Sequence, residues 1–279
     1  DIDMSAYTGT QYKMISGFSG TLDGNGYAIH NLTYTTNIEA CCVGLISSTH
    51  NATIKNLHLE NVNISSRCDY VGSLVGEMFG GVIDNCSATG TIAGRSCVGG
   101  LVGLHDFTAG IITKSFCSGT VTGYNSVGGL VGELYGIVSQ SYNQCTVIGT
   151  GTDKYGAPSS AIGGIAGFQM GGSIKDCYNT GYISGNSMVG GIAGRGGWIQ
   201  NCYSIGIVTG YFRSGGLSGM SYGIINSYWD RQTSGVLSSG GGKGRTTEQM
   251  KQPATYIGWN NDGFVWTLSE GQDYPRLAW

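Results

Sequence analysis

The stretch Val98-Gly99-Gly100-Leu101-Val102-Gly103 decides the fold, because close variants of it recur along most of the chain. Consecutive copies lie about 27 residues apart, and the longest step holds an insertion over residues 149–160. A fixed period of this length indicates a repeat architecture. The first glycines of the aligned copies are Gly44, Gly72, Gly99, Gly128, Gly163, Gly190 and Gly215.

Two shorter signatures accompany the first one in most units. Residues 199–203 read Ile-Gln-Asn-Cys-Tyr, and residues 206–210 read Gly-Ile-Val-Thr-Gly. Each unit thus holds three short β-prone runs bounded by Gly or Asn. A propeller blade needs about 40 residues, and helical repeats would show a period of 3.6. We therefore predict an all-β, single-stranded parallel β-helix (β-solenoid) of about seven rungs of about 27 residues, with turn Asn side chains bonded from rung to rung.

Composition narrows the class of protein. The chain has 279 residues with 51 Gly and 3 Pro, and 11 % of its residues are charged. Gly lacks the triplet period of collagen, and a hydrophobic content of 40 % is too high for a disordered glycine-rich chain. The net charge of −3 without a basic stripe argues against nucleic acid, and no apolar run is long enough for a membrane span. The opening Asp1-Ile2-Asp3 lacks an initiator Met and predicts a processed or trimmed end.

The repeat pattern divides the chain into three regions. Residues 1–40 are predicted to form an irregular first rung that caps the solenoid, and residues 41–228 to form the repeats. Residues 229–279 hold most of the Trp and are predicted to form a C-terminal cap. Within it, Thr246-Thr247-Glu248-Gln249 has the form of a capping box for a short helix that ends before Pro253. Open sheet edges at the two ends would favour end-to-end self-association.

An aromatic ladder is the main candidate for ligand binding. Stacked rings offer flat apolar faces to a sugar. The alternative, which we favour at this stage, is that the rings pack on one another or fill the core. The residues occupy the same place in five successive rungs and are Phe116, Tyr142, Tyr178, Tyr203 and Tyr228.

Nine cysteines without a CxxC pair argue against a zinc site, and their odd number leaves at least one thiol free or paired between chains. Cys86, Cys177 and Cys202 share their place with Leu and Ser in other rungs, which predicts a small buried slot. The alternative is a disulfide between Cys177 and Cys202, which would lie one rung apart. Cys41 and Cys68 form a second candidate disulfide between neighbouring rungs.

Paired carboxylates test the chain for an enzyme. Glu77 and Glu133 follow the last Gly of the first signature and are expected about 9–10 Å apart, near the range of inverting glycosidases. Leu104 stands between them, and no acidic cluster joins them, so we expect no catalytic residues, no metal and no cofactor. The sequons at Asn31, Asn51 and Asn63 are candidate N-glycosylation sites.

The quoted core resembles the GLUG repeat of secreted bacterial and archaeal surface proteins. The opening at residues 18–29 and the ending, with Tyr228-Trp229-Asp230 and Tyr274-Pro275-Arg276-Leu277, are similar to the ends of such proteins. The family includes adhesins and accessory regions of large secreted proteases, so the resemblance implies an extracellular scaffold. It defines no catalytic residue that could be transferred to this chain.

These observations favour a secreted or cell-surface structural or adhesive protein rather than an enzyme. It could be a rod that binds a glycan or a host surface, or a subunit of a head-to-tail filament. Two alternatives stay open: a polysaccharide lyase or hydrolase built on a β-helix, and a non-catalytic module of a larger secreted protease.

Overall fold

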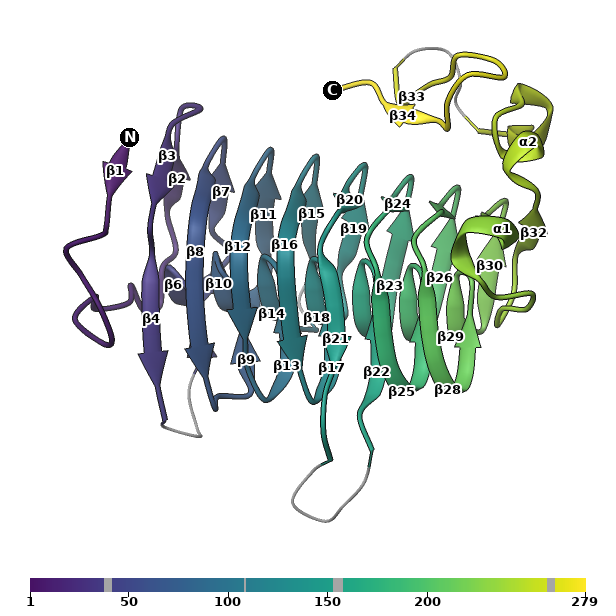
Figure 1. The fold of residues 1–279 in the computed structure, drawn as a ribbon. Coiled ribbons are helices and arrows are strands. Elements are labelled where there is room, and N and C mark those ends of the chain that lie inside the picture. The colour runs from purple at the N-terminus through teal and green to yellow at the C-terminus, as the bar shows by residue number, and fades with distance from the viewer. Residues whose placement is uncertain (38–41, 108, 153–157, 260–263) are drawn as a thin grey trace.

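The computed structural model describes residues 1–37, 42–107, 109–152, 158–259 and 264–279. It confirms an all-β parallel solenoid of about eight turns, in which successive repeats stack along one axis (Figure 1). The turn beyond the seven that carry the glycine signature is formed by the N-terminal residues. No described helix is long and apolar enough to cross a membrane.

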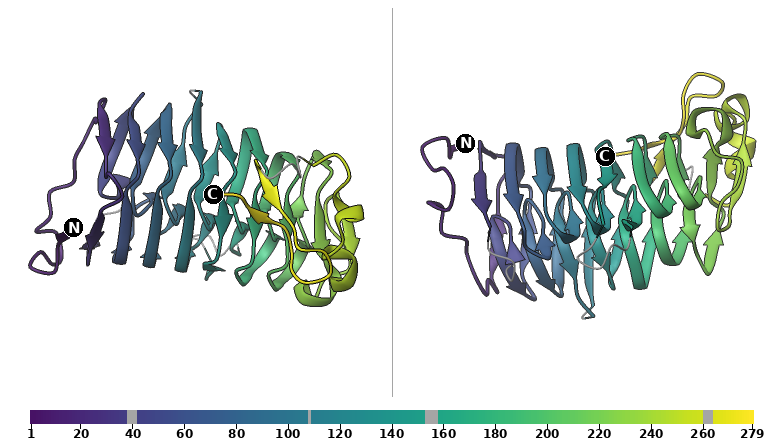
Figure 2. Two further views of the ribbon diagram at one scale, coloured as in Figure 1. Left: turned by 90° about the horizontal axis from the view of Figure 1, so that it is seen from above. Right: turned by 60° about the horizontal axis from the view of Figure 1, so that its bottom comes forward.

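Two long parallel sheets form the walls of the solenoid (Figure 2). In the first sheet, one row of strands is β1 (Ile2–Asp3), β3 (Ala28–His30), β4 (Thr33–Thr36), β8 (His58–Ser66), β12 (Ser87–Ala93), β16 (Phe116–Gly123), β20 (Tyr142–Asn143), β21 (Thr146–Gly149), β24 (Tyr178–Asn179), β27 (Tyr203–Ser204), β31 (Tyr228–Asp230) and β32 (Lys243–Arg245). A second row is β5 (Cys42–Val43), β9 (Tyr70–Val71), β13 (Ser96–Gly99), β17 (Asn125–Gly128) and β22 (Ser160–Gly163), and β25 (Ile183–Gly190) and β28 (Val208–Gly215) span both rows.

The second sheet also has two rows, which meet at a corner. One row is β6 (Ile46–His50), β10 (Val75–Phe79), β14 (Val102–His105), β18 (Val131–Leu134) and β29 (Ser218–Met220). The other row is β2 (Thr21–Asp23), β7 (Thr53–Lys55), β11 (Gly81–Asp84), β15 (Gly110–Thr113), β19 (Ile137–Ser139) and β30 (Gly223–Ile225), and β23 (Ala166–Lys175) and β26 (Ala193–Gln200) run through the corner.

The glycines of the signature allow the chain to approach itself closely. Val98 pairs with Val71 and Val127 of the neighbouring rungs and is fully buried. A Cβ on Gly99 would lie 2.0 Å from the Val102 carbonyl oxygen, because the chain turns sharply there between two strands. A Cβ on Gly100 would lie 2.4 Å from Cys117 Sγ, so this glycine makes room for the Cys117 side chain.

The predicted Asn ladder is present in the structure. The turn before the Cys or Ser slot is left-handed in every full rung, and Asn56, Asn85 and Asn201 all have φ of 52° there. The Nδ2 of Asn85 donates to Asn56 Oδ1 at 2.9 Å, and that of Asn56 donates to Asp23 Oδ1 at 3.0 Å. Asn is one of the few residues with a side chain that adopts this conformation readily, which explains its recurrence.

The C-terminal segment first closes the end of the solenoid. Helix α1 (Arg231–Ser234) follows β31, and the N–H of Gly216 in the last rung donates to the Ser238 carbonyl at 3.0 Å. Helix α2 (Thr247–Met250) then begins at a capping box formed by Thr246 and Gln249, as predicted. It is followed by the 3-10 helix η1 (Pro253–Tyr256).

The last residues then fold back along one side of the solenoid. They form a small antiparallel pair of β33 (Trp266–Thr267) and β34 (Arg276–Leu277). In Figure 1 this yellow segment runs above the ends of the rungs, and the C-terminus lies near the middle of the rod rather than at its end. The predicted boundary between residues 40 and 41 lies outside the described residues.

Candidate binding site

The predicted aromatic ladder forms a continuous stack. Phe116, Tyr142, Tyr178 and Tyr203 follow one another with ring centroids 4.8, 4.8 and 5.2 Å apart and planes within 7° of parallel. Tyr228 is paired with Tyr203 in the next rung. We call these five residues the tyrosine stack.

The C-terminal segment covers this stack. The rings of Trp266 lie 5.9 Å from Tyr203 and 6.2 Å from Tyr178, and Tyr203 donates its hydroxyl hydrogen to the Pro275 carbonyl at 2.6 Å. Trp279 lies 5.7 Å from Tyr142. Over its covered part the stack thus packs against the protein's own aromatic side chains, which is the alternative to sugar binding that we favoured from the sequence.

The cysteine slot is buried and its thiols are free. Cys86, Cys177 and Cys202 are all free, so the alternative disulfide between the last two is not formed. In this slot the N–H of Cys177 donates to Cys202 Sγ at 3.4 Å. The Ser115 and Ser227 hydroxyl oxygens accept the equivalent N–H groups of Cys86 and Cys202. The slot thus supplies an acceptor from the next rung.

The second predicted disulfide involves Cys68, which is buried and disulfide-bonded. Cys41, the partner that we predicted for it, lies outside the described residues. Disulfides persist in oxidising compartments.

The two candidate carboxylates lie at equivalent positions two rungs apart, as the repeat spacing predicts. Glu77 and Glu133 each pair with Leu104 in the rung between them. Glu77 accepts a hydrogen bond from Cys42 Sγ at 3.4 Å, and Glu133 accepts one from Cys97 Sγ at 3.2 Å. Within the described ranges no group of three or more His, Cys, Asp or Glu could hold a metal ion.

The three sequons differ in their surroundings. The Nδ2 of Asn31 donates to Asp3 Oδ1 at 2.9 Å, whereas Asn51 and Asn63 are exposed. Asn51 also lines a surface hollow described below. Glycosylation at these positions stays a prediction.

A second series of aromatic residues, which the sequence analysis missed, follows the corner of the second sheet. We call this edge, with the hollows between its rings, the corner groove. Phe107 and Tyr135 are in ring contact at 3.8 Å, and the ring of His50 stacks on Phe79 at 4.9 Å. Phe107, Trp198 and Tyr222 are 75 %, 61 % and 74 % exposed. The rings of the corner groove belong to His50, Phe79, Phe107, Tyr135, Phe168, Trp198 and Tyr222.

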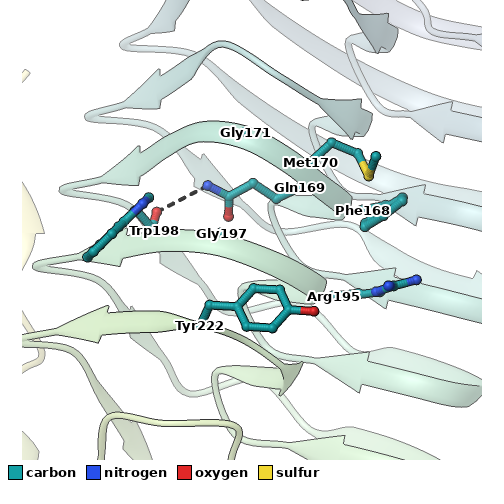
Figure 3. Close-up of a pocket in the computed structure, with 8 residues that line it drawn as sticks. All are labelled: Phe168, Gln169, Met170, Gly171, Arg195, Gly197, Trp198 and Tyr222. Carbon is teal, nitrogen blue, oxygen red and sulfur yellow. Dashed lines mark hydrogen bonds between the residues drawn. The ribbon is translucent and has the colours of Figure 1, made fainter.

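The more polar hollow of the corner groove has a volume of about 320 Å³. Figure 3 shows Trp198 on one side of it, Phe168 and Arg195 on the other, and the Tyr222 phenol pointing toward the Arg195 side. The Arg195 guanidinium lies over the Phe168 ring at 4.9 Å from its centroid. A planar cation, exposed rings and a buried amide thus meet at one place on the surface.

The Gln169 side chain lies beneath this hollow, in the inward-facing row of Leu134. It is 1 % exposed, and its Nε2 donates to the Trp198 carbonyl at 3.2 Å, which is the dashed line in Figure 3. Its Oε1 is buried and has no donor among the described residues. Trp198 extends over the next rung, because a Cβ on Gly223 would lie 2.6 Å from its Cε3 atom.

A larger and more apolar hollow of about 530 Å³ adjoins the first one, since Gly171 lines one and Gly172 the other. Its walls include Val82, Ile111 and Ile137. The corner groove therefore extends along several rungs, with its arginine toward the C-terminal end of the rod.

Comparison with known proteins agrees with the repeat pattern. Residues 158–184 carry the GLUG motif. This GLUG segment includes β22, β23 and β24 and hence the Phe168–Gly172 part of the corner groove. Residues 4–90 match the family described as the M26 IgA1-specific metallo-endopeptidase N-terminal region.

Two individual proteins are similar to this GLUG-containing chain. A 90-residue segment, 32 % of the chain, is 39 % identical to halomucin of Haloquadratum walsbyi and spans about 1 % of the length of halomucin. The crystal structure of a putative immunoglobulin A1 protease from Bacteroides ovatus covers 100 % of the chain with a TM-score of 0.60 and 19 % identity, and the match covers 84 % of that protease chain. This likeness shows the fold.

Proposed function

We propose that this chain is a non-catalytic β-solenoid module of a secreted or cell-surface protein, and that its corner groove binds extracellular glycans. The observation that carries the proposal is the row of exposed rings along one edge of a rigid rod. Exposed aromatic residues in such number are unusual on a surface that contacts only water, and large apolar surfaces commonly mark binding sites. Tyr and Trp combine a flat apolar face with a polar group, which suits the ring of a sugar.

The comparisons support the extracellular location and the non-catalytic role in this proposal. Residues 4–90 match a family described as the N-terminal region of a metallo-endopeptidase, and a further similarity is to halomucin. A disulfide at Cys68 favours an oxidising compartment. Glu77 and Glu133 are separated by an apolar residue, so these two described carboxylates are not a ready pair for a glycosidase.

The test is a binding measurement with a panel of neutral and acidic oligosaccharides, using calorimetry or a glycan array. Trp198→Ala is expected to weaken binding about tenfold, because it removes the largest exposed ring of the polar hollow. Tyr211→Ala is the matched control, since Tyr211 is 93 % exposed on β28 of the other sheet. Equal binding by the two variants would refute the groove as the binding site.

A rod that self-associates end to end is the other version of a structural role. Light scattering of the purified chain distinguishes the two versions. Particles that grow with concentration and do not require glycan would favour the filament, whereas a constant monomeric mass would leave the glycan-binding rod.

A further inference from the structure

We propose that the polar hollow of the corner groove recognises the carboxylate of an acidic sugar through Arg195. This inference rests on the proposed function and names the chemical class of its ligand. Arg195 forms no ion pair with a described carboxylate. Its Nε is buried and has no hydrogen-bond acceptor within the described residues.

Arg195 can therefore still bind an anion through its guanidinium group. The guanidinium lies over the Phe168 ring, and this contact restricts its side chain, so less rotamer freedom is lost when a ligand binds. A guanidinium offers parallel N–H groups that match the two oxygens of a carboxylate. The preferred ligand group at this position is therefore a planar anion rather than a hydroxyl.

The remainder of the hollow suits a ring that carries hydroxyl groups. The Trp198 ring lies on the next rung and presents an exposed face, and Tyr222 brings a phenol to the same hollow. The Gln169 side chain faces inward in the row of Leu134 and contributes no group to the ligand. Acidic sugars such as uronic and sialic acids combine a carboxylate with these groups.

The surrounding charge sets the orientation of the ligand. Glu133 pairs with Phe168, which pairs with Arg195, so this carboxylate stands about 10 Å from the guanidinium along the rod. Its own hydrogen-bond donors are Cys97 and Tyr135. Repulsion from Glu133 favours a ligand whose acidic group lies at Arg195 and whose neutral part extends toward Trp198.

The experiment compares matched acidic and neutral ligands by calorimetry: sialyllactose against lactose, and oligogalacturonate against its methyl ester. Wild-type protein is expected to bind at least one acidic ligand about tenfold or more tightly than its neutral partner. Arg195→Gln should abolish that preference, so that the acidic ligand binds no more tightly than its neutral partner. Arg67→Gln, at an exposed arginine between β8 and β9, should keep the preference.

The two proposals fail in different ways. If Trp198→Ala weakens binding while Arg195→Gln leaves the acidic preference intact, the groove binds glycans but Arg195 is not the carboxylate site. If no variant in the groove changes the binding of any ligand, the proposed function fails as well. The sialic and uronic arms show which source of carboxylate the hollow accepts.

An independent observation concerns two buried thiols on the opposite sheet. Cys117 lies in β16, and Cys145 lies between β20 and β21 of the next rung. Both thiols are free in the structure and fully buried, but their Sγ atoms are only 2.7 Å apart, closer than two unbonded sulfur atoms rest. The geometry points to a disulfide between Cys117 and Cys145.

The reaction is a two-electron oxidation. Two thiols lose two protons and two electrons to a disulfide-bearing oxidant, such as oxidised glutathione or a thiol oxidoreductase, and an S–S bond forms. Burial raises the pKa of the Cys145 thiol, so the attacking thiolate is scarce once the rungs have stacked.

Peptide mapping by mass spectrometry tests this bond in protein refolded with a glutathione redox buffer and denatured without reductant in the presence of an alkylating agent. A cross-linked peptide pair containing Cys117 and Cys145 is expected. Cys177 and Cys202, which also occupy adjacent rungs, should be alkylated and serve as the internal control. Alkylation of both Cys117 and Cys145 would overturn the inference.

Discussion

At the scale of single residues, the fold contains a few polar side chains in unfavourable surroundings or backbone conformations. His105 is the sharpest case. It is fully buried in the row of inward-facing residues between Met78 and Leu134, and neither ring nitrogen has a hydrogen-bond partner among the described residues. Burial lowers the pKa of His105 to about 4, against the weaker opposing effect of Asp106.

This lowered pKa predicts a loss of stability in mild acid. The unfolded chain takes up a proton at its ordinary pKa near 6.5, whereas the folded chain does so only near pH 4. Stability is thus fully present above pH 6.5 and falls by about 3 kcal/mol as the pH drops to 4. His105→Leu, which matches Leu134 in the next rung, should remove most of this dependence. Urea titrations at several pH values measure it, and a slope shared by both proteins would contradict the prediction.

The Asn ladder offers a second test at this scale. Asn85 combines a left-handed backbone with a hydrogen bond to Asn56. Asn85→Ala loses the bond and must adopt a strained conformation, so we expect a loss of about 2 kcal/mol in the free energy of unfolding. Asn85→Gly loses the bond but tolerates the positive φ, and about half that loss is expected. Equal losses in both variants would mean that backbone conformation contributes nothing.

At the scale of elements, the C-terminal segment is held mainly by rings. Trp266 is fully buried and contacts Trp259 at 4.8 Å, besides two members of the tyrosine stack. Trp266→Ala should lower the free energy that holds this segment on the rungs by about 3–5 kcal/mol. Because the segment packs on the outside of the rungs, we expect it to detach while the solenoid stays folded. Hydrogen exchange should rise over residues 264–279 but remain slow in β12 and β16.

The same element shows what sequence can and cannot predict. The rungs were predictable, because Val98 and its equivalents recur at a fixed period and rung stacking follows from that period. The alignment of Tyr142, Tyr178 and Tyr203 also predicted their stacking. Repeat position, however, states only where a residue lies within a rung. It does not state what covers the outside, so the folding of Trp266 over the stack was not predictable.

The corner groove was missed for a related reason. Its rings lie around the corner of the second sheet, where the number of residues differs between rungs, so Phe107, Trp198 and Tyr222 do not align in the repeat. Only the folded chain brings them to one edge. The close approach of Cys117 and Cys145 was also not predictable, because the two thiols occupy different positions in their rungs.

At the scale of the whole molecule, stability is a sum over neighbouring rungs. Removing residues 97–125 joins Ser96 to Ser126, and it preserves register because Ser96 already pairs with Asn125. This deletion should leave a folded rod that is shorter by about 5 Å. Removing residues 97–111 breaks the register of every later rung and should yield an aggregated or unfolded chain. Small-angle X-ray scattering measures both outcomes, and a compact second variant would contradict the rung model.

The path of the C-terminal segment also has a mechanical consequence. Trp279 Nε1 donates to the Gln140 carbonyl at 2.9 Å, far from the last rung from which the segment departs. A pulling force applied at the C-terminus would act first on Trp279, then on β34 and β33, and would peel these contacts away one at a time. The rungs would bear that force only after the segment had detached. The segment would therefore extend under load before the solenoid itself begins to unfold.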